Sequence, residues 1–313
     1  MNTKKFLGAA SLAAVSALVL VGCAPANDTP TGLTGTVTID GSSTVAPLME
    51  AAADLYGAVQ PEVNVTVGTS GTGGGFEKFC AGETDISNAS RPIKDEEAAL
   101  CAENGIEFQE IVVANDGLSV VVNPDNDWAK CLTVEQLNTM WAPESEGVVT
   151  SWNQIDASFP DEKLSLFGPG TDSGTFDYFT DEINGEEGAS RTDYSPSEDD
   201  NVLVSGVSAE VGASGYFGLS YALENADKVS IVAVDSGAGC ITPSNDTVSD
   251  GSYTPLSRPL FVYVNKVNFA ENAALASFAE FVVANSGEAA AAAGFIGLTA
   301  DQTARAEEAL ASI

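Results

Sequence analysis

Three segments rich in glycine, serine and threonine share one chemical design. They are 40–47 (DGSSTVAP), 68–76 (GTSGTGGGF) and 168–176 (GPGTDSGTF), and each lies between a predicted strand and a predicted helix. The first turn of a helix has unpaired backbone N–H groups and the positive end of the helix dipole, so it can bind an anion. Glycines let the backbone approach closely, and hydroxyls add neutral donors. One such loop alone most often only caps a helix, whereas three in one chain indicate a shared oxyanion pocket.

A fourth segment, 85–93 (DISNASRPI), supplies a cation. Arg91 is one of only four arginines, and the following Pro92 restricts it to an extended backbone conformation. A guanidinium binds phosphate or sulfate through two parallel hydrogen bonds. The alternative for Arg91 is a surface salt bridge in a very acidic chain.

Composition excludes several classes of chemistry. The 313 residues contain 45 acidic and 12 basic side chains and no histidine, which gives a formal net charge of −33. The absence of histidine rules out Ser-His-Asp and Cys-His triads and His-ligated zinc. A strongly negative field disfavours nucleic acid as a partner, because binding it needs a basic face. At 44% hydrophobic residues the chain still has the composition of a folded protein.

The N-terminus is typical of an export signal. Lys4 and Lys5 precede an apolar stretch, 6–21, which runs into Leu-Val-Gly-Cys at 20–23, and the whole pattern resembles a bacterial lipoprotein signal. We therefore expect residues 1–22 to be removed, Cys23 to be lipidated, and residues 23–32 to form a tether to the cell membrane. A plain secretory signal or a membrane helix are the alternatives, although the apolar stretch is short for a span. Loss of the two lysines would bring the net charge to −35.

Four further cysteines are Cys80, Cys101, Cys131 and Cys240. An even number outside the cytoplasm favours two disulfides over a metal site. Three pairings are open at this point, and free buried thiols are the alternative.

The loops lie in an alternation of β-branched and Ala-rich amphipathic stretches, which predicts an α/β fold. Strands are predicted at 36–39, 63–67, 85–87, 108–114, 118–122, 164–167, 229–234 and 259–265. Helices are predicted at 47–58, 74–80, 95–104, 134–140, 174–183, 271–284 and over the Ala-rich C-terminus. The triplet Asn115-Asp116-Gly117 predicts a turn between two of these strands. The acid-rich segments 181–200 and 244–252 are predicted to be solvated loops.

In combination, these strings resemble the substrate-binding lipoproteins of bacterial phosphate ABC importers, the PstS type. The resemblance runs from about Gly35 through the C-terminal helices. It is carried by DGSST at 40–44, GTSGTGGGF at 68–76, ASRPI at 89–93 and DSGTF at 172–176, with VVNP at 121–124 and GYFG at 215–218.

The resemblance implies a type II periplasmic binding protein fold, an α/β architecture of two lobes joined by two hinge-crossing strands. The crossings would fall near 112–118 and 256–262. Lobe one would comprise residues 33–114 and 260–313, and lobe two residues 115–259. Pairing Cys80 with Cys101 and Cys131 with Cys240 would keep each bridge within one lobe.

The resemblance also implies that phosphate lies between the lobes and that their closure around it is a hinge motion. Its expected ligands are Ser43, Thr44, Val45, Ser70 and Arg91 from lobe one and Ser173, Gly174 and Thr175 from lobe two. Some family members have an arginine in the loop before Ser-Gly-Thr, where this chain has 168–171 (GPGT), so charge roles do not transfer directly. Asp172 is our candidate acceptor for the proton of hydrogenphosphate, which sulfate lacks. Its alternative role is to cap the following helix.

We therefore expect an extracytoplasmic, lipid-anchored monomer that binds inorganic phosphate and delivers it to ABC permease subunits. No catalysis, cofactor or metal is expected. Binding of another tetrahedral oxyanion (sulfate, tungstate or arsenate) is the alternative within this class. A secreted hydrolase using paired carboxylates or metal, and a surface protein for adhesion or signalling, are the alternatives from other classes.

Overall fold

The computed structural model describes residues 32–171 and 173–313. The expected signal peptide, the lipidation site Cys23, the tether up to residue 31 and the proton acceptor Asp172 lie outside the described residues. Among the described residues, no helix combines the length and the apolar character needed to cross a bilayer.

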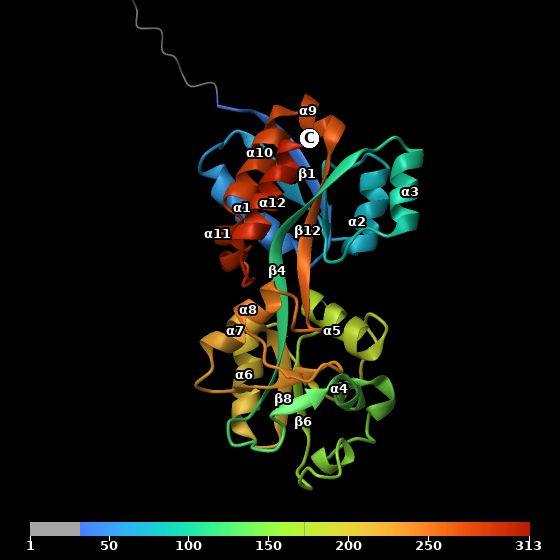
Figure 1. Ribbon diagram of the computed structural model, residues 1–313, viewed down its shortest axis with the longest axis vertical. Helices are drawn as coiled ribbons and strands as arrows, with labels where there is room; N and C mark the ends of the chain where they lie inside the picture. The colour runs from blue at the N-terminus through green and yellow to red at the C-terminus, as the bar shows by residue number, and fades with distance from the viewer. Residues whose placement is uncertain (1–31, 172) are drawn as a thin grey trace, which may run out of the picture. The chain divides into compact units, whose positions relative to one another are not determined.

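Two long antiparallel strands run through both lobes. They are β4 (Phe108–Val122) and β12 (Ser257–Asn265), the teal-to-green and orange strands in the middle of Figure 1. In the described chain the strand order of the main sheet is β2-β1-β3-β12-β4-β8-β6-β7, with β9 also paired to β4. The two crossing strands therefore connect a first lobe on the β3 side to a second lobe on the β8 side.

The turn predicted at Asn115-Asp116-Gly117 is wrong, because this triplet continues β4. It pairs in register with residues 257–259 of β12. The side chains of Asn115 and Asp116 are buried there, and they find polar partners in Gln302 and Arg258. Cross-strand pairing thus removes the need for a turn at a sequence that favours one.

Lobe one packs helices on both faces of a small sheet. Apolar residues of β1, β4 and β12 form one core with helices α1 and α10, and a second cluster including Phe76 and Tyr263 lies under α2 and α3. Besides β4 and β12, its elements are β1 (Gly35–Gly41), α1 (Ala46–Gly57), β2 (Val63–Val67), α2 (Gly71–Cys80), β3 (Ile86–Ala89), α3 (Asp95–Glu103), α9 (Lys266–Glu271), α10 (Ala273–Ala284), α11 (Ser286–Ala292) and α12 (Ala300–Ala311).

Lobe two surrounds the other ends of the same strands with a core that includes Trp141, Trp152 and Tyr216. Its elements are β5 (Cys131–Thr133), α4 (Val134–Trp141), β6 (Ser165–Gly168), α5 (Gly174–Asn184), β7 (Ser195–Pro196), α6 (Asp200–Ala209), β8 (Ala213–Gly218), α7 (Leu219–Glu224), β9 (Ser230–Ile231), β10 (Ala233–Asp235), β11 (Cys240–Ile241), α8 (Asn245–Ser249) and two short 3-10 turns (Pro143–Ser145, Trp152–Gln154). The exact lobe boundaries remain a prediction, since β4 and β12 pass through them without a break.

Two disulfides join the predicted partners. Cys80 at the end of α2 is bonded to Cys101 in α3, and Cys131 in β5 is bonded to Cys240 in β11. The first bridge holds together the two helices that flank the Arg91 segment.

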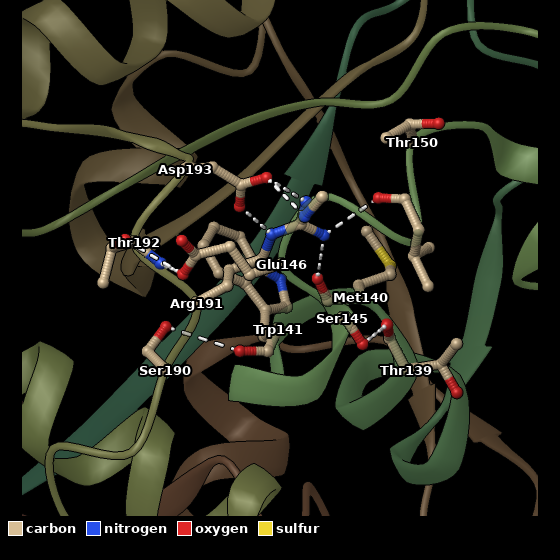
Figure 2. Close-up of polar contacts among 12 residues, drawn as sticks. Thr139, Met140, Trp141, Ser145, Glu146, Thr150, Ser190, Arg191, Thr192 and Asp193 are labelled. Atoms are coloured by element: carbon tan, nitrogen blue, oxygen red, sulfur yellow. Dashed lines mark hydrogen bonds and ion pairs between the residues drawn. The ribbon is translucent and has the colours of Figure 1, made fainter.

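A buried arginine fastens the end of α4 to the segment that follows α5 (Figure 2). Arg191 is only 4% exposed, and its guanidinium donates to the backbone carbonyls of Met140 and Val149 and to the Asp193 carboxylate. The pairing with Arg191 lowers the pKa of Asp193 to about 2. Arg191 therefore serves the packing of lobe two, and its bonds within this cluster leave it no role in anion binding.

Candidate functional site

The helix-capping loops of both lobes meet at one cavity of about 820 Å³. Lobe one contributes the loop before α1, the start of α2 and the segment after β3. Lobe two contributes the first turns of α5, and β12 runs past both. The lining includes Ser42, Ser43, Thr44, Ser70, Gly71, Thr72, Gly73, Ser90, Arg91, Lys94, Gly174, Asp177, Tyr178, Ser257 and Arg258.

The loops before α1 and α5 touch each other. A methyl group added to Gly174 would lie 2.3 Å from Thr44 Oγ1 and 3.0 Å from Thr44 N, so only glycine permits this approach. Behind this contact, Ser173 caps α5 by accepting a hydrogen bond from the backbone N–H of Thr175. The N-termini of two helices from different lobes therefore converge at Thr44, where an anion can use both.

Arg258, in β12, is a second arginine that lines this cavity. Its Nη2 donates to Thr44 Oγ1 (3.1 Å), and its Nε lies 3.3 Å from Oδ2 of the buried Asp116 on β4. The guanidinium also stacks on the ring of Tyr178, 3.6 Å from the centroid. Contacts with β4, α5 and the α1 loop hold Arg258 in one orientation between the lobes.

Arg91 also lines the cavity, but its guanidinium is engaged elsewhere. Both terminal nitrogens donate to the carboxylate of Glu97 in α3, at 2.8 and 2.7 Å. Glu97 also accepts the N–H of Lys94 and so caps the helix. This is the salt bridge that the sequence left open as the alternative role, although the side chain still borders the cavity.

The structure brings together Ser43, Thr44, Ser70, Arg91 and Gly174 of the predicted ligands. Val45 is fully buried in the core of lobe one, so only its backbone faces the loop. Ser173 and Thr175 are tied into the cap of α5 and are not among the lining residues. Asp172 lies outside the described residues.

Sequence reasoning missed Arg258 and its partners Asp116 and Tyr178. One signal for Arg258 was present, because Ser257-Arg258-Pro259 repeats the serine-arginine-proline order of 90–92 within the predicted second crossing. Nothing in the sequence indicates the cross-strand pairing with Asp116, which depends on the register of β4 against β12.

The α5 side of the cavity is acidic. Asp177, Asp181, Glu182 and Glu187 all line it. Burial and the nearby Glu187 raise the pKa of Asp177 to about 6, although Arg258 acts in the opposite direction. Carboxylates repel an anion, so the helix N-termini and hydroxyls of the cavity are the more favourable place for it.

The donor set of this cavity suits a small oxyanion. Backbone N–H groups, hydroxyls and one guanidinium can surround tetrahedral oxygens without a metal. Within residues 32–171 and 173–313, no three acidic or cysteine side chains are grouped as metal ligands.

The chain is similar to known proteins over most of its length. A model of the PBP superfamily domain matches residues 26–286. The protein SphX of Synechocystis sp. is 45% identical over 282 residues, covering 90% of this chain and 83% of that protein. The phosphate-binding protein PstS of Staphylococcus saprophyticus is 39% identical over 265 residues, covering 84% and 81%. The chain belongs to the PstS/SphX family of the PBP superfamily.

A solved structure of the same kind supports the fold. The crystal structure described as that of a possible phosphate binding protein from Planctomyces limnophilus has a TM-score of 0.85 and 44% identity, covering 90% of this chain and 99% of that one. The type II periplasmic binding protein fold predicted from the sequence motifs is therefore confirmed. Within the PstS/SphX family, the cavity between the lobes is where a ligand is expected.

Proposed function

We propose that this protein binds inorganic phosphate outside the cytoplasm and delivers it to an ABC permease. The observation that carries the proposal is the meeting of the α1 and α5 N-termini with Arg258 at one cavity, in a chain of the PstS/SphX family. Nearby N–H groups, hydroxyls and one oriented guanidinium supply the hydrogen bonds that a tetrahedral anion needs. The function is binding and release, not catalysis.

Arg258 is the cation that we assign to the bound anion. It faces the α1 loop through Thr44, whereas the guanidinium of Arg91 is occupied by Glu97. Ser43, Thr44, Ser70 and Gly174, which all line the cavity at the helix ends, complete the proposed contacts. Arg91 contributes charge at the cavity edge.

Ligand binding would hold the two lobes together. Thr44 belongs to lobe one and Gly174 to lobe two, so an anion seated on both loops bridges them. Hinge movement about β4 and β12 would then open and close the site. This gives a permease two distinguishable forms of the protein to recognise.

Calorimetry on ligand-stripped protein tests the proposal. We expect stoichiometric binding of phosphate and much weaker binding of sulfate. Comparable affinities would favour a general oxyanion-binding protein, and the absence of any oxyanion binding would contradict the proposal. Turnover of a phosphate ester would instead support the hydrolase alternative.

We also propose that the protein is anchored through a lipid on Cys23, on the strength of the sequence at 20–23. Membrane fractionation of Cys23→Ser tests it, since this variant should leave the membrane fraction. Retention of the variant in that fraction would contradict the anchor.

A further inference from the structure

The hydrogen of the Ser70 hydroxyl is already used in a hydrogen bond within the protein. Ser70 Oγ donates to Oδ1 of Asp40 at 2.6 Å, and the backbone N–H of Ser70 donates to the same oxygen at 3.0 Å. An ionised carboxylate only accepts hydrogen bonds, so the hydrogen between the two oxygens is that of the serine. Ser70 therefore presents lone pairs to the cavity that it lines.

Asp40 is kept ionised by a second partner. Lys78 Nζ lies 2.5 Å from its Oδ2. Burial acts to raise the pKa of Asp40, but the hydrogen bonds from Lys78 and Ser70 outweigh burial and lower it. The carboxylate thus remains an acceptor that fixes the direction of the Ser70 hydroxyl.

The hydroxyl of Thr44, which also lines the cavity, is oriented the opposite way. Thr44 Oγ1 accepts a hydrogen bond from Arg258, so its own hydrogen is free to donate to an anion. Ser70 differs from Thr44 in being a neutral acceptor.

We propose that Ser70 accepts the hydrogen bond of the protonated oxygen of hydrogenphosphate, with Asp40 as the positioning residue that makes Ser70 an acceptor. The inference rests on the proposed phosphate-binding function and concerns how that site selects its ligand. Hydrogenphosphate has one O–H to give to Ser70. Sulfate has none, so it would place an oxygen lone pair against that of Ser70 and would lose a hydrogen bond that hydrogenphosphate makes.

A neutral acceptor such as Ser70 can accept the hydrogen bond of hydrogenphosphate with less repulsion than a carboxylate would cause. The ligand is a dianion, and a carboxylate in contact with it adds like-charge repulsion. The negative charge of Asp40 is separated from the proposed ligand by Ser70, to which Asp40 is hydrogen-bonded, and it is balanced by Lys78. The acidic residues Asp172 and Asp177 are the competing candidates.

Calorimetric titration of the full chain with phosphate, arsenate and sulfate tests the assignment. Ser70→Ala should weaken the binding of phosphate and arsenate about tenfold and leave the binding of sulfate unchanged or tighter. The ratio of the sulfate Kd to the phosphate Kd should therefore fall at least tenfold. Asp40→Ala frees the Ser70 hydrogen to donate, so it should tighten sulfate. Ser70 is exposed, which keeps its variant informative if Asp40→Ala is destabilised.

Ser158→Ala is the matched control. Ser158 makes the same pair of bonds, from N and Oγ to one oxygen of Asp156, on the surface of lobe two. It should change neither affinity. Thr44→Val removes a donor and should weaken phosphate and sulfate alike.

Three results would separate the possible failures. If the parent protein binds neither phosphate nor arsenate, the proposed function itself fails. If the parent binds phosphate but Ser70→Ala weakens phosphate and sulfate equally, Ser70 is a donor and the inference is overturned. If Asp172→Asn or Asp177→Asn narrows the ratio and Ser70→Ala does not, the acceptor is that carboxylate.

Discussion

At the scale of single residues, the two arginines of the cavity are not equivalent. Arg91 gives both terminal nitrogens to Glu97, whereas Arg258 is 15% exposed and held between Asp116 and the ring of Tyr178. A guanidinium whose orientation is already fixed loses little freedom when it binds an anion. The cation that we assign to phosphate, Arg258, is therefore one whose orientation is fixed before the anion binds.

Replacing each arginine by glutamine measures this difference. Arg258→Gln should weaken phosphate by about 3 kcal/mol, roughly a hundredfold in Kd, because it removes a charged hydrogen-bonding partner from a closed site. Arg91→Gln should weaken phosphate binding by less than about 1 kcal/mol, because the guanidinium of Arg91 is partly exposed and already paired with Glu97. Calorimetry gives both values. A larger loss for Arg91→Gln would restore Arg91 as the main cation.

Arg258→Gln also leaves the buried Asp116 without its partner, so its stability must be followed. Arg258→Lys keeps the charge beside Asp116 but loses the planar fork and most of the stacking on Tyr178. If the affinity falls in both variants while the lysine variant keeps its thermal midpoint, the loss belongs to anion binding and not to unfolding.

At the scale of elements, the sequence predicts the glycine- and hydroxyl-rich loops of the cavity, but it does not predict the strand pairing beside them. Glycine and hydroxyl residues between a strand and a helix are local signals, and Thr44 and Gly174 do meet in the cavity. The continuous β4 was missed because Asn115-Asp116-Gly117 favours a turn locally, and only its pairing with β12 overrides that preference. Arg258 was missed for the same reason, since its partner Asp116 is 142 residues away in the chain.

The contact between the loops makes Gly174 a test of lobe closure. Gly174→Ala would place a methyl group against Thr44 Oγ1, so the α5 loop must move away from the α1 loop. We expect phosphate affinity to fall at least tenfold, because the two helix ends then cannot reach one anion. Calorimetry measures the loss.

Gly287→Ala provides the control for this substitution. Gly287 is also a helical glycine, in α11, and a methyl group there meets no atom within 4 Å. It should leave phosphate affinity unchanged. An unchanged affinity in Gly174→Ala as well would show that the close approach of the two loops is not required for binding.

At the scale of the whole molecule, a net charge of −33 accompanies an anion site. The two are compatible because the bound anion is held by groups within hydrogen-bond distance, while most acids lie farther off. Charges separated by more than about 10 Å are largely screened at 0.1 M salt. Four acidic residues are the exception, since Asp177, Asp181 and Glu182 of α5 and Glu187 just after it line the cavity itself.

This separation of distances predicts how salt acts on binding kinetics. A phosphate ion approaching a strongly negative protein is repelled over long range, so its association rate should rise as sodium chloride is added. The dissociation rate depends on the short contacts that we propose with Thr44 and Arg258, so it should change little with salt. Stopped-flow measurements over a series of salt concentrations give both rates. An association rate that falls with salt would mean that Arg258 and its neighbours dominate the field even at a distance, and that the surface acids do not govern the approach of the ligand.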